Sequence, residues 1–149
     1  MSGRRAVLIA LAGAVAVAGC GDSGPPRMSK AAYQRRGEAI CTNYLSQIDK
    51  LGRPDQLDQI APYLAKALPI LSVTVDRLGT LRPPKDLDDQ FTRYLDAMRA
   101  TRKRAFDLRN AAARADGARV QGLLSDAARA GTTTDELARK AQLSGCVQG

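Results

Sequence analysis

The sequence predicts an all-α protein, an up-down-up-down four-helix bundle. Three observations lead to this fold class. Apolar residues recur at intervals of three and four along residues 29–141, which is the spacing that places them on one face of a helix. No segment alternates convincingly between apolar and polar residues, as a half-buried β-strand would. The connections between these helical segments, which glycine and proline mark, are short. Consecutive helices should therefore lie antiparallel and side by side.

The first two predicted helices are separated by Gly52 and Pro54. The first begins after Ser29, whose hydroxyl is a good N-cap, and its apolar stripe consists of Tyr33, Gly37, Ile40, Cys41, Tyr44, Ile48 and Leu51. The stripe of the second, which runs to Pro83-Pro84, consists of Leu57, Ile60, Leu64, Leu68, Leu71, Val75 and Leu78. Because proline lacks a backbone N–H, we expect Pro62 to open the second helix as its first residue and Pro69 to kink it.

The third and fourth predicted helices meet at a turn, Asp116-Gly117. The stripe of the third consists of Leu87, Phe91, Tyr94, Met98, Ala105, Leu108 and Ala112. The stripe of the fourth consists of Val120, Leu124, Ala127, Gly131, Leu137 and Ala141. Two interpretations of the fourth stay open. Thr133 followed by Glu136 fits a capping box and favours a fresh start after Gly131, whereas the unbroken apolar spacing favours one continuous helix.

Residues 1–19 have the layout of a secretory signal. Met1–Arg5 carries two positive charges, and Ala6–Gly19 is a run of small and aliphatic residues, shorter than the roughly 20 needed to span a membrane. The run leads into Val17-Ala18-Gly19-Cys20, which resembles the lipobox of bacterial lipoproteins. The resemblance implies cleavage before Cys20, a diacylglyceryl thioether on its sulfur, and acyl chains such as palmitate that anchor the protein. Arg4-Arg5 also resembles, more weakly, a twin-arginine signal, so the export route stays open.

Residues 20–28 are predicted to form a lipidated cysteine and a flexible tether, and residues 29–149 the folded domain. Gly21–Met28 is rich in glycine and proline and reaches less than roughly 30 Å when extended, so the domain should lie close to the outer face of the cell membrane. Removal of residues 1–19 discards Arg4 and Arg5 and no acid, which leaves 21 basic and 15 acidic residues and a net charge of +6. Such a domain is attracted to anionic headgroups.

Once the resemblance assigns Cys20 to lipid, Cys41 and Cys146 remain. In a compartment outside the reducing cytosol, an even pair of cysteines is most simply a disulfide. Because the fourth helix should end near the start of the first, while Cys41 lies about three turns inside, either the tail from Leu143 folds back or the first helix overhangs. The chain has no Cys-x-x-Cys arrangement of the kind that redox catalysts use.

A wider resemblance covers most of the mature chain. Cys41 in the first helix, Leu78 and Leu81 ahead of Pro83-Pro84, the Asp116-Gly117 turn and the terminal Gly145-Cys146 are together similar to small actinobacterial lipoproteins with a helical domain. The resemblance implies a disulfide-linked bundle and no biochemical activity.

Basic residues gather on the third predicted helix. The candidate contacts to an anionic surface are Arg99, Arg102, Lys103 and Arg104, with Arg93, Arg109 and Arg114 nearby. A patch of this kind attracts phosphate-bearing lipid or polymer. The alternative is an ordinary solvated helix face, because Asp89–Arg93 and Lys103–Asp107 are i,i+4 pairs that would neutralise part of the charge.

The sequence predicts no metal site and no cofactor. Asp86, Asp88 and Asp89 lack the glycine and distal glutamate of a calcium loop and follow Pro84, where acids favour a helix N-terminus. The chain contains no histidine, which removes imidazole ligands and the commonest proton shuttle. Its six aromatic residues are scattered and suit a core better than a nucleic-acid platform. They are Tyr33, Tyr44, Tyr63, Phe91, Tyr94 and Phe106.

Two function classes are therefore open, and neither is an enzyme, because no nucleophile has an adjacent base. The first is a membrane-tethered interaction module of the cell envelope, whose partner would be a protein, an anionic lipid or a wall polymer. It predicts an exposed apolar or basic patch. The second is a carrier or sensor for a small apolar ligand, which predicts a cavity of roughly 300 Å³ or more between the helices.

Overall fold

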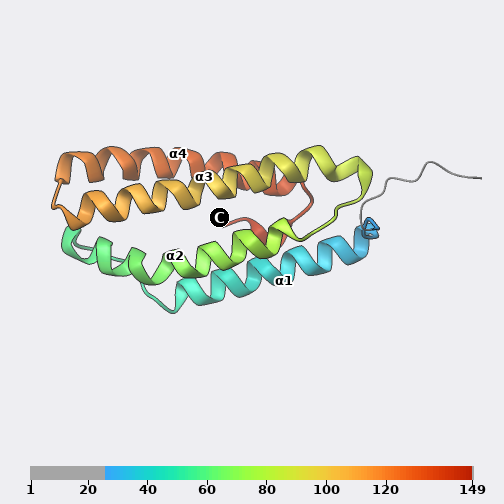
Figure 1. Ribbon diagram of the computed structural model, residues 1–149, viewed down its shortest axis with the longest axis horizontal. Helices are drawn as coiled ribbons and strands as arrows, with labels where there is room; N and C mark the ends of the chain where they lie inside the picture. The colour runs from blue at the N-terminus through green and yellow to red at the C-terminus, as the bar shows by residue number, and fades with distance from the viewer. Residues whose placement is uncertain (1–25, 149) are drawn as a thin grey trace, which may run out of the picture.

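The computed structural model describes residues 26–148, and these form the predicted four-helix bundle. Successive helices run antiparallel, up-down-up-down, and Figure 1 shows α1 and α2 side by side beneath α3 and α4. No β-strand occurs between residues 26 and 148. The elements are α1 (Lys30–Asp49), α2 (Leu57–Gly79), the short 3₁₀ helix η1 (Lys85–Leu87), α3 (Asp88–Ala113), α4 (Gly117–Lys140) and a second 3₁₀ helix, η2 (Ser144–Cys146).

The secretory signal, the lipobox and Cys20 lie outside the described residues. Within residues 26–148, no helix combines the length and the apolar character needed to cross a membrane. At the C-terminal end of the predicted tether, the Met28 N–H donates to the Arg82 carbonyl at 2.8 Å. Arg27 donates to Asp88 at 2.9 Å and to the Pro83 carbonyl at 3.2 Å. Residues 27 and 28 are thus bonded to the α2–α3 connection.

Side-chain caps fix two of the helix starts. Ser29 caps α1 as predicted, because its hydroxyl accepts the Ala32 N–H at 3.2 Å. Asp116 caps α4 by accepting the Arg119 N–H at 3.0 Å. The turn that joins α3 to α4 is tight, and Ala115 within it has a φ of 53°. This is a left-handed conformation, which is unfavourable for any residue other than glycine.

The prediction that Pro62 opens the second helix is wrong. α2 begins at Leu57, and both Pro62 and Pro69 lie inside it. A proline at position 62 removes the one N–H that would have reached the Asp58 carbonyl. Both proline side chains are exposed, so water can serve the carbonyls that the helix leaves unpaired, and the helix continues through both sites.

The structure decides between the two interpretations of the fourth helix, because α4 is continuous through Gly131. Thr133, the residue that suggested a new N-cap, instead donates its hydroxyl to the Arg129 carbonyl at 3.4 Å. Thr134 donates to the Ala130 carbonyl at 2.8 Å. Both hydroxyls are therefore bonded within one helix.

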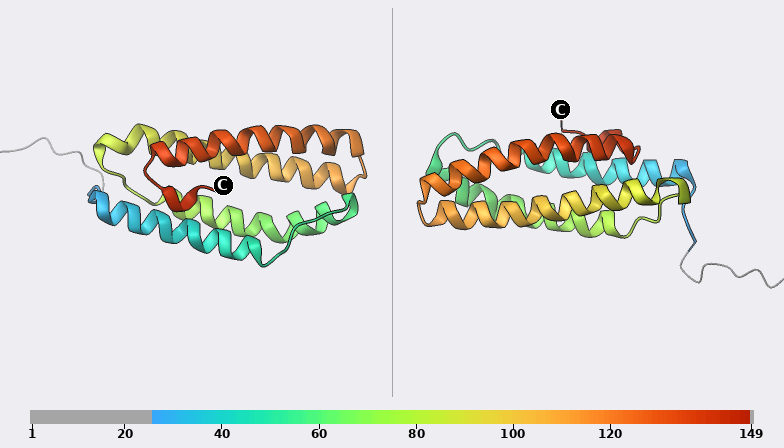
Figure 2. Two further views of the ribbon diagram at one scale, coloured as in Figure 1. Left: turned by 180° about the vertical axis from the view of Figure 1, so that it is seen from behind. Right: turned by 90° about the horizontal axis from the view of Figure 1, so that it is seen from above.

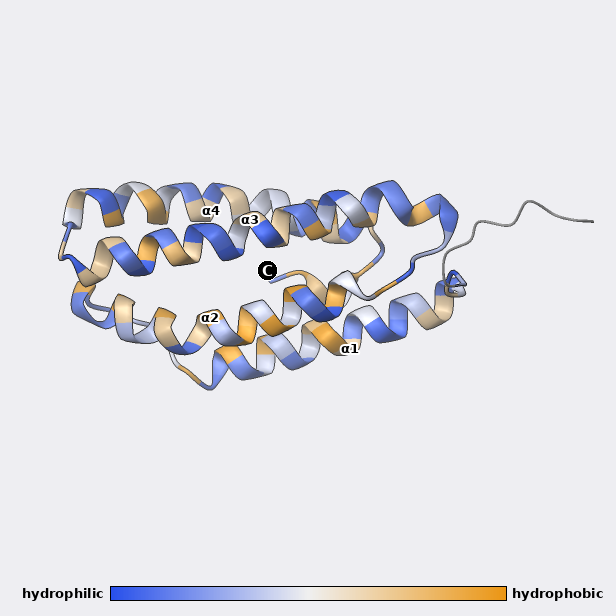
Figure 3. Cartoon of the chain, viewed as in Figure 1, coloured by the Kyte–Doolittle hydropathy of each residue, from blue (hydrophilic) through white to orange (hydrophobic). Residues whose placement is uncertain are grey.

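The helices enclose two separate apolar clusters, and Figure 3 shows apolar residues recurring along α2 between polar ones. The larger cluster surrounds Tyr33, Leu78, Tyr94 and Leu143, each at most 1% exposed. In it, the rings of Tyr33 and Phe91 meet edge to face, with centroids 5.6 Å apart. The second cluster is built from α2, α3 and α4 alone. Its buried members are Leu64, Leu68, Leu108, Ala111, Ala112, Val120 and Leu123.

The C-terminal tail folds back between α1 and α4, as one of the two predicted alternatives requires (Figure 2). Cys41 and Cys146 form the predicted disulfide, with Cα atoms 4.9 Å apart. Leu143 is fully buried against Gly37, and the Tyr33 hydroxyl donates to the Ala141 carbonyl at 2.9 Å. The tail is therefore held by a covalent bond, by packing and by a buried hydrogen bond.

Candidate functional site

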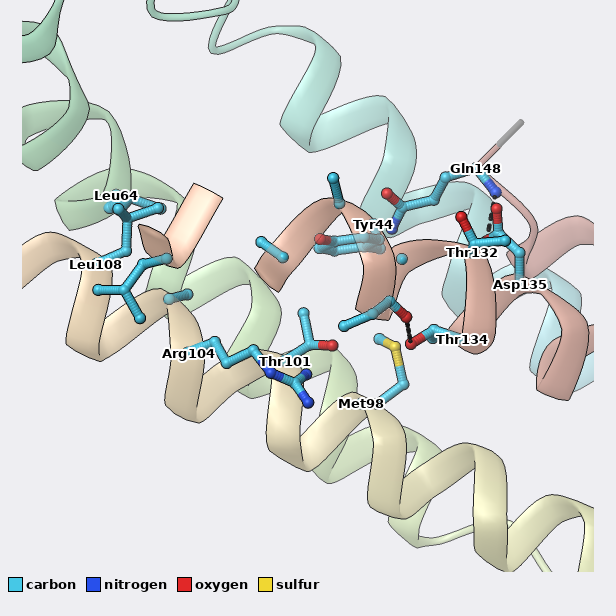
Figure 4. Close-up of a pocket in the computed structure, with 16 residues that line it drawn as sticks. Tyr44, Leu64, Met98, Thr101, Arg104, Leu108, Thr132, Thr134, Asp135 and Gln148 are labelled. Atoms are coloured by element: carbon cyan, nitrogen blue, oxygen red, sulfur yellow. Dashed lines mark hydrogen bonds between the residues drawn. The ribbon is translucent and has the colours of Figure 1, made fainter. Parts of the chain in front are cut away.

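A pocket of about 380 Å³ lies between the two apolar clusters (Figure 4). α3 and α4 form its long walls. Tyr44 of α1, Leu64 of α2 and Gln148 of the tail complete the lining. Ala128 and Thr132 belong to the lining and are exposed, so they mark the side on which the pocket opens to solvent.

Small side chains explain why space remains at this level of the bundle. α4 presents Ala127, Ala130 and Gly131 to the pocket, and α3 presents Ala105. Ala105 packs against both clusters without bridging the space between them. Protein interiors are close-packed where side chains interlock, and alanine and glycine are too short to interlock across neighbouring helices.

One end of the pocket is apolar. Leu64 and Leu108 lie together there in Figure 4, and Leu123 belongs to the same cluster. Each of these side chains is at most 8% exposed. An apolar molecule that entered the pocket would therefore contact side chains already shielded from water, which is the usual composition of a small-molecule site.

The opposite end is polar and includes the tail. Asp135 accepts the Gln148 backbone N–H at 3.1 Å, and Figure 4 shows the two residues beside Thr132. Tyr44 forms part of the same wall. Burial raises the pKa of its phenol, with a smaller increase from Tyr63, while a hydrogen bond from the Gln148 side chain opposes the shift. Tyr44 is therefore protonated and uncharged at neutral pH.

Arg104 is the cation of the pocket. Its side chain is partly buried and lies beside Thr101 between the two ends (Figure 4). Among residues 26–148, no hydrogen bond or ion pair reaches it. The Thr101 hydroxyl donates to the Ala97 carbonyl at 3.0 Å, so its oxygen can still accept a hydrogen bond but its proton is engaged.

The other three predicted anionic-surface residues do not share this environment. Arg99 pairs with Asp96 at 2.9 Å, Arg102 pairs with Asp76 at 3.3 Å, and Lys103 forms the expected i,i+4 pair with Asp107 at 2.9 Å. No Asp89–Arg93 ion pair accompanies them in the described part of the chain. The structure thus separates Arg104 from the three neighbours with which the sequence grouped it.

Of the predicted acidic cluster, Asp88 and Asp89 lie in the first turn of α3, and Asp88 contacts the N-terminal segment. Asp88 bonds to Arg27, and this hydrogen bond is the main reason that the pKa of its carboxyl lies below the ordinary value. Within residues 26–148, no group of three or more cysteine, aspartate or glutamate side chains is arranged to hold a metal ion.

Sequence reasoning did not find the pocket. The apolar spacing predicts Tyr44 as a core residue, and it predicts no role for Asp135 or Gln148. The cluster of short side chains at Ala127, Ala128, Ala130 and Gly131 was the available signal. It fits the apolar spacing of α4 and yet supplies little volume for a core.

Comparisons with protein-family models, with curated proteins and with solved structures found no match to this chain.

Proposed function

We propose that the chain is an exported, lipid-anchored binding protein that holds a small, largely apolar molecule in the pocket between α3 and α4 and catalyses no reaction. The pocket carries this proposal, because its volume of about 380 Å³ lies within the range of small-molecule sites. Anchoring through Cys20 rests on the lipobox resemblance and would place the pocket close to the outer face of the cell membrane.

The chemistry of the lining supports an apolar occupant. Leu64, Leu108 and Leu123 form the buried apolar end of the pocket, and each methylene that a ligand buries there contributes about 0.8 kcal/mol. The polar groups of the lining lie at the other end or, like Thr101 and Arg104, between the two ends (Figure 4). A carrier and a sensor both need such a site, and either would bind its ligand in the same pocket.

Surface features give less support to a docking module. Three of the four cations that would have formed a basic patch are paired with carboxylates. The large exposed apolar side chains are distributed over three helices, namely Leu57 and Val73 on α2, Phe106 on α3 and Leu124 on α4. Of these, Phe106 has the Arg109 guanidinium 5.1 Å from its ring centroid.

Two glycines on α4 allow a matched test. Gly131 lines the pocket and Gly122 does not. A Cβ atom added at either position would meet nothing within 4 Å, and replacing glycine inside a helix stabilises it by up to about 1 kcal/mol. Gly131 is exposed like Ala128 and Thr132, so Gly131→Leu should obstruct the open side of the pocket while the protein stays folded, and Gly122→Leu serves as the control.

The measurement is photolabelling of the full chain, purified and held in phospholipid nanodiscs, by a diazirine analogue of 1-decanol. Peptide mass spectrometry should place the label on residues 98–108 of α3 and 123–135 of α4. Gly131→Leu should lose most of this label and Gly122→Leu should keep it. A label spread along the outer faces of the helices, and equal in both variants, would refute the binding function.

A further inference from the structure

The four cations that the sequence groups on α3 differ in what surrounds them. Arg99, Arg102 and Lys103 each lie within 3.3 Å of a carboxylate oxygen. Arg104, although next to Lys103 in sequence, lines the pocket and has no carboxylate partner among residues 26–148. A partly buried guanidinium without an anion has lost part of its hydration, and such a charge gains most from a partner.

The pocket thus combines a buried apolar end with one unpaired cation. We infer that its ligand is an amphiphilic carboxylate, with its hydrocarbon part against Leu64 and Leu108 and its carboxylate on the Arg104 guanidinium. This inference rests on the proposed function, since it names the ligand class of the same pocket. A planar guanidinium matches a carboxylate through two parallel N–H···O bonds.

Asp135 is the competing charge in the lining. Its carboxylate is engaged by the Gln148 N–H at 3.1 Å, and it lies at the tail end of the pocket, apart from Arg104 (Figure 4). If Asp135 determined selectivity instead, the pocket would prefer an alkylammonium to an alkyl carboxylate. The two assignments therefore predict opposite orders of affinity for ligands of one chain length.

The test is competition against the diazirine-decanol label by decanoate, 1-decanol and decylammonium. All three share one hydrocarbon chain, and at about pH 7 the carboxylate is charged. Decanoate should compete at a concentration about tenfold lower than 1-decanol, which is the effect of one charge-assisted hydrogen-bond pair. Decylammonium should compete least well.

Two arginine variants form a matched pair for this experiment. Arg104→Gln removes the pocket cation, and Arg102→Gln removes a neighbouring cation that is paired with Asp76 outside the pocket. Because both variants are measured in the same nanodiscs, partition of each competitor into lipid cancels in their ratio. The preference for decanoate over decanol should fall to about twofold or less in Arg104→Gln and should persist in Arg102→Gln.

The outcomes separate the two proposals. Labelling confined to the pocket, with equal competition by decanoate and decanol in the wild type, would overturn the carboxylate assignment and leave the binding function intact. A preference for decylammonium would do the same and point to Asp135. A preference for decanoate that survives in Arg104→Gln would also overturn it. Labelling outside the pocket would overturn both proposals.

Discussion

Removal of the Cys41–Cys146 disulfide should destabilise the bundle strongly. The two cysteines are 105 residues apart, so the bond closes a loop that includes almost the whole domain. A chain-entropy treatment gives about 4.7 kcal/mol for a loop of this length, and measured losses in small exported domains run from roughly 2 to 5 kcal/mol. With roughly 120 folded residues, the melting temperature should fall by roughly 8 to 20 °C.

The assay is thermal unfolding followed by circular dichroism for Cys41→Ala, Cys146→Ala and the double variant. The loss belongs to the cross-link and not to either sulfur alone, so the double variant should be nearly as stable as each single variant. Reductant should lower the melting temperature of the wild type by a similar amount and should leave the three variants unchanged.

Two results would refute this reasoning. A wild-type melting temperature that is insensitive to reductant, with loss of the cross-link verified by mass, would show that loop closure contributes nothing. Losses in the two single variants that add in the double variant would show that each cysteine acts through its own packing. Cys41 is only 2% exposed, so a small packing contribution is expected, and it should be well below the cross-link effect.

Three further predictions concern single positions. Gly37→Ala should destabilise the protein by about 1 kcal/mol or more in a urea titration, because the new Cβ would overlap Leu143 Cδ2 and lie 3.4 Å from its Cδ1. Gly122→Ala is the control, because open space surrounds Gly122, and it should stabilise the protein by up to about 1 kcal/mol. Ala115→Gly should raise stability by roughly 1 kcal/mol, because the φ of 53° at this turn suits glycine; an unchanged urea midpoint would contradict the assigned strain. Cys20→Ala should move the protein from the detergent phase to the aqueous phase of a Triton X-114 separation, and unchanged partitioning would contradict lipidation.

The fold could be predicted from the sequence because its determinants are local. Apolar spacing, the Ser29 cap and the turn at Asp116-Gly117 each act within a few residues, and all three are present in the structure. The error at Pro62 has a physical cause. Proline inside a helix loses one hydrogen bond and crowds the carbonyl of residue i−4, and this cost is smaller where water can reach the freed carbonyl. Whether a helix face is exposed depends on tertiary packing.

The candidate site was less predictable because it depends on what the bundle leaves unfilled. The positive charge at Arg104 is visible in the sequence, but nothing local distinguishes it from Arg102 or Lys103. The distinction arises because Asp76, which pairs with Arg102, comes from α2, and because Arg104 lines the pocket that α3 forms with α4. Both facts concern neighbours distant in sequence, which periodicity does not contain.

Helix length and the returning tail together account for the position of the pocket. At about 1.5 Å per residue, the 20 residues of α1 span about 30 Å, whereas the 26 residues of α3 span about 39 Å. α1 therefore cannot cover the full length of its neighbours. The tail lies between α1 and α4 (Figure 2), and it reaches the pocket with Gln148. The disulfide holds this segment in place, so the bond that stabilises the bundle also fixes one wall of the pocket, and reduction should weaken ligand binding as well as the fold.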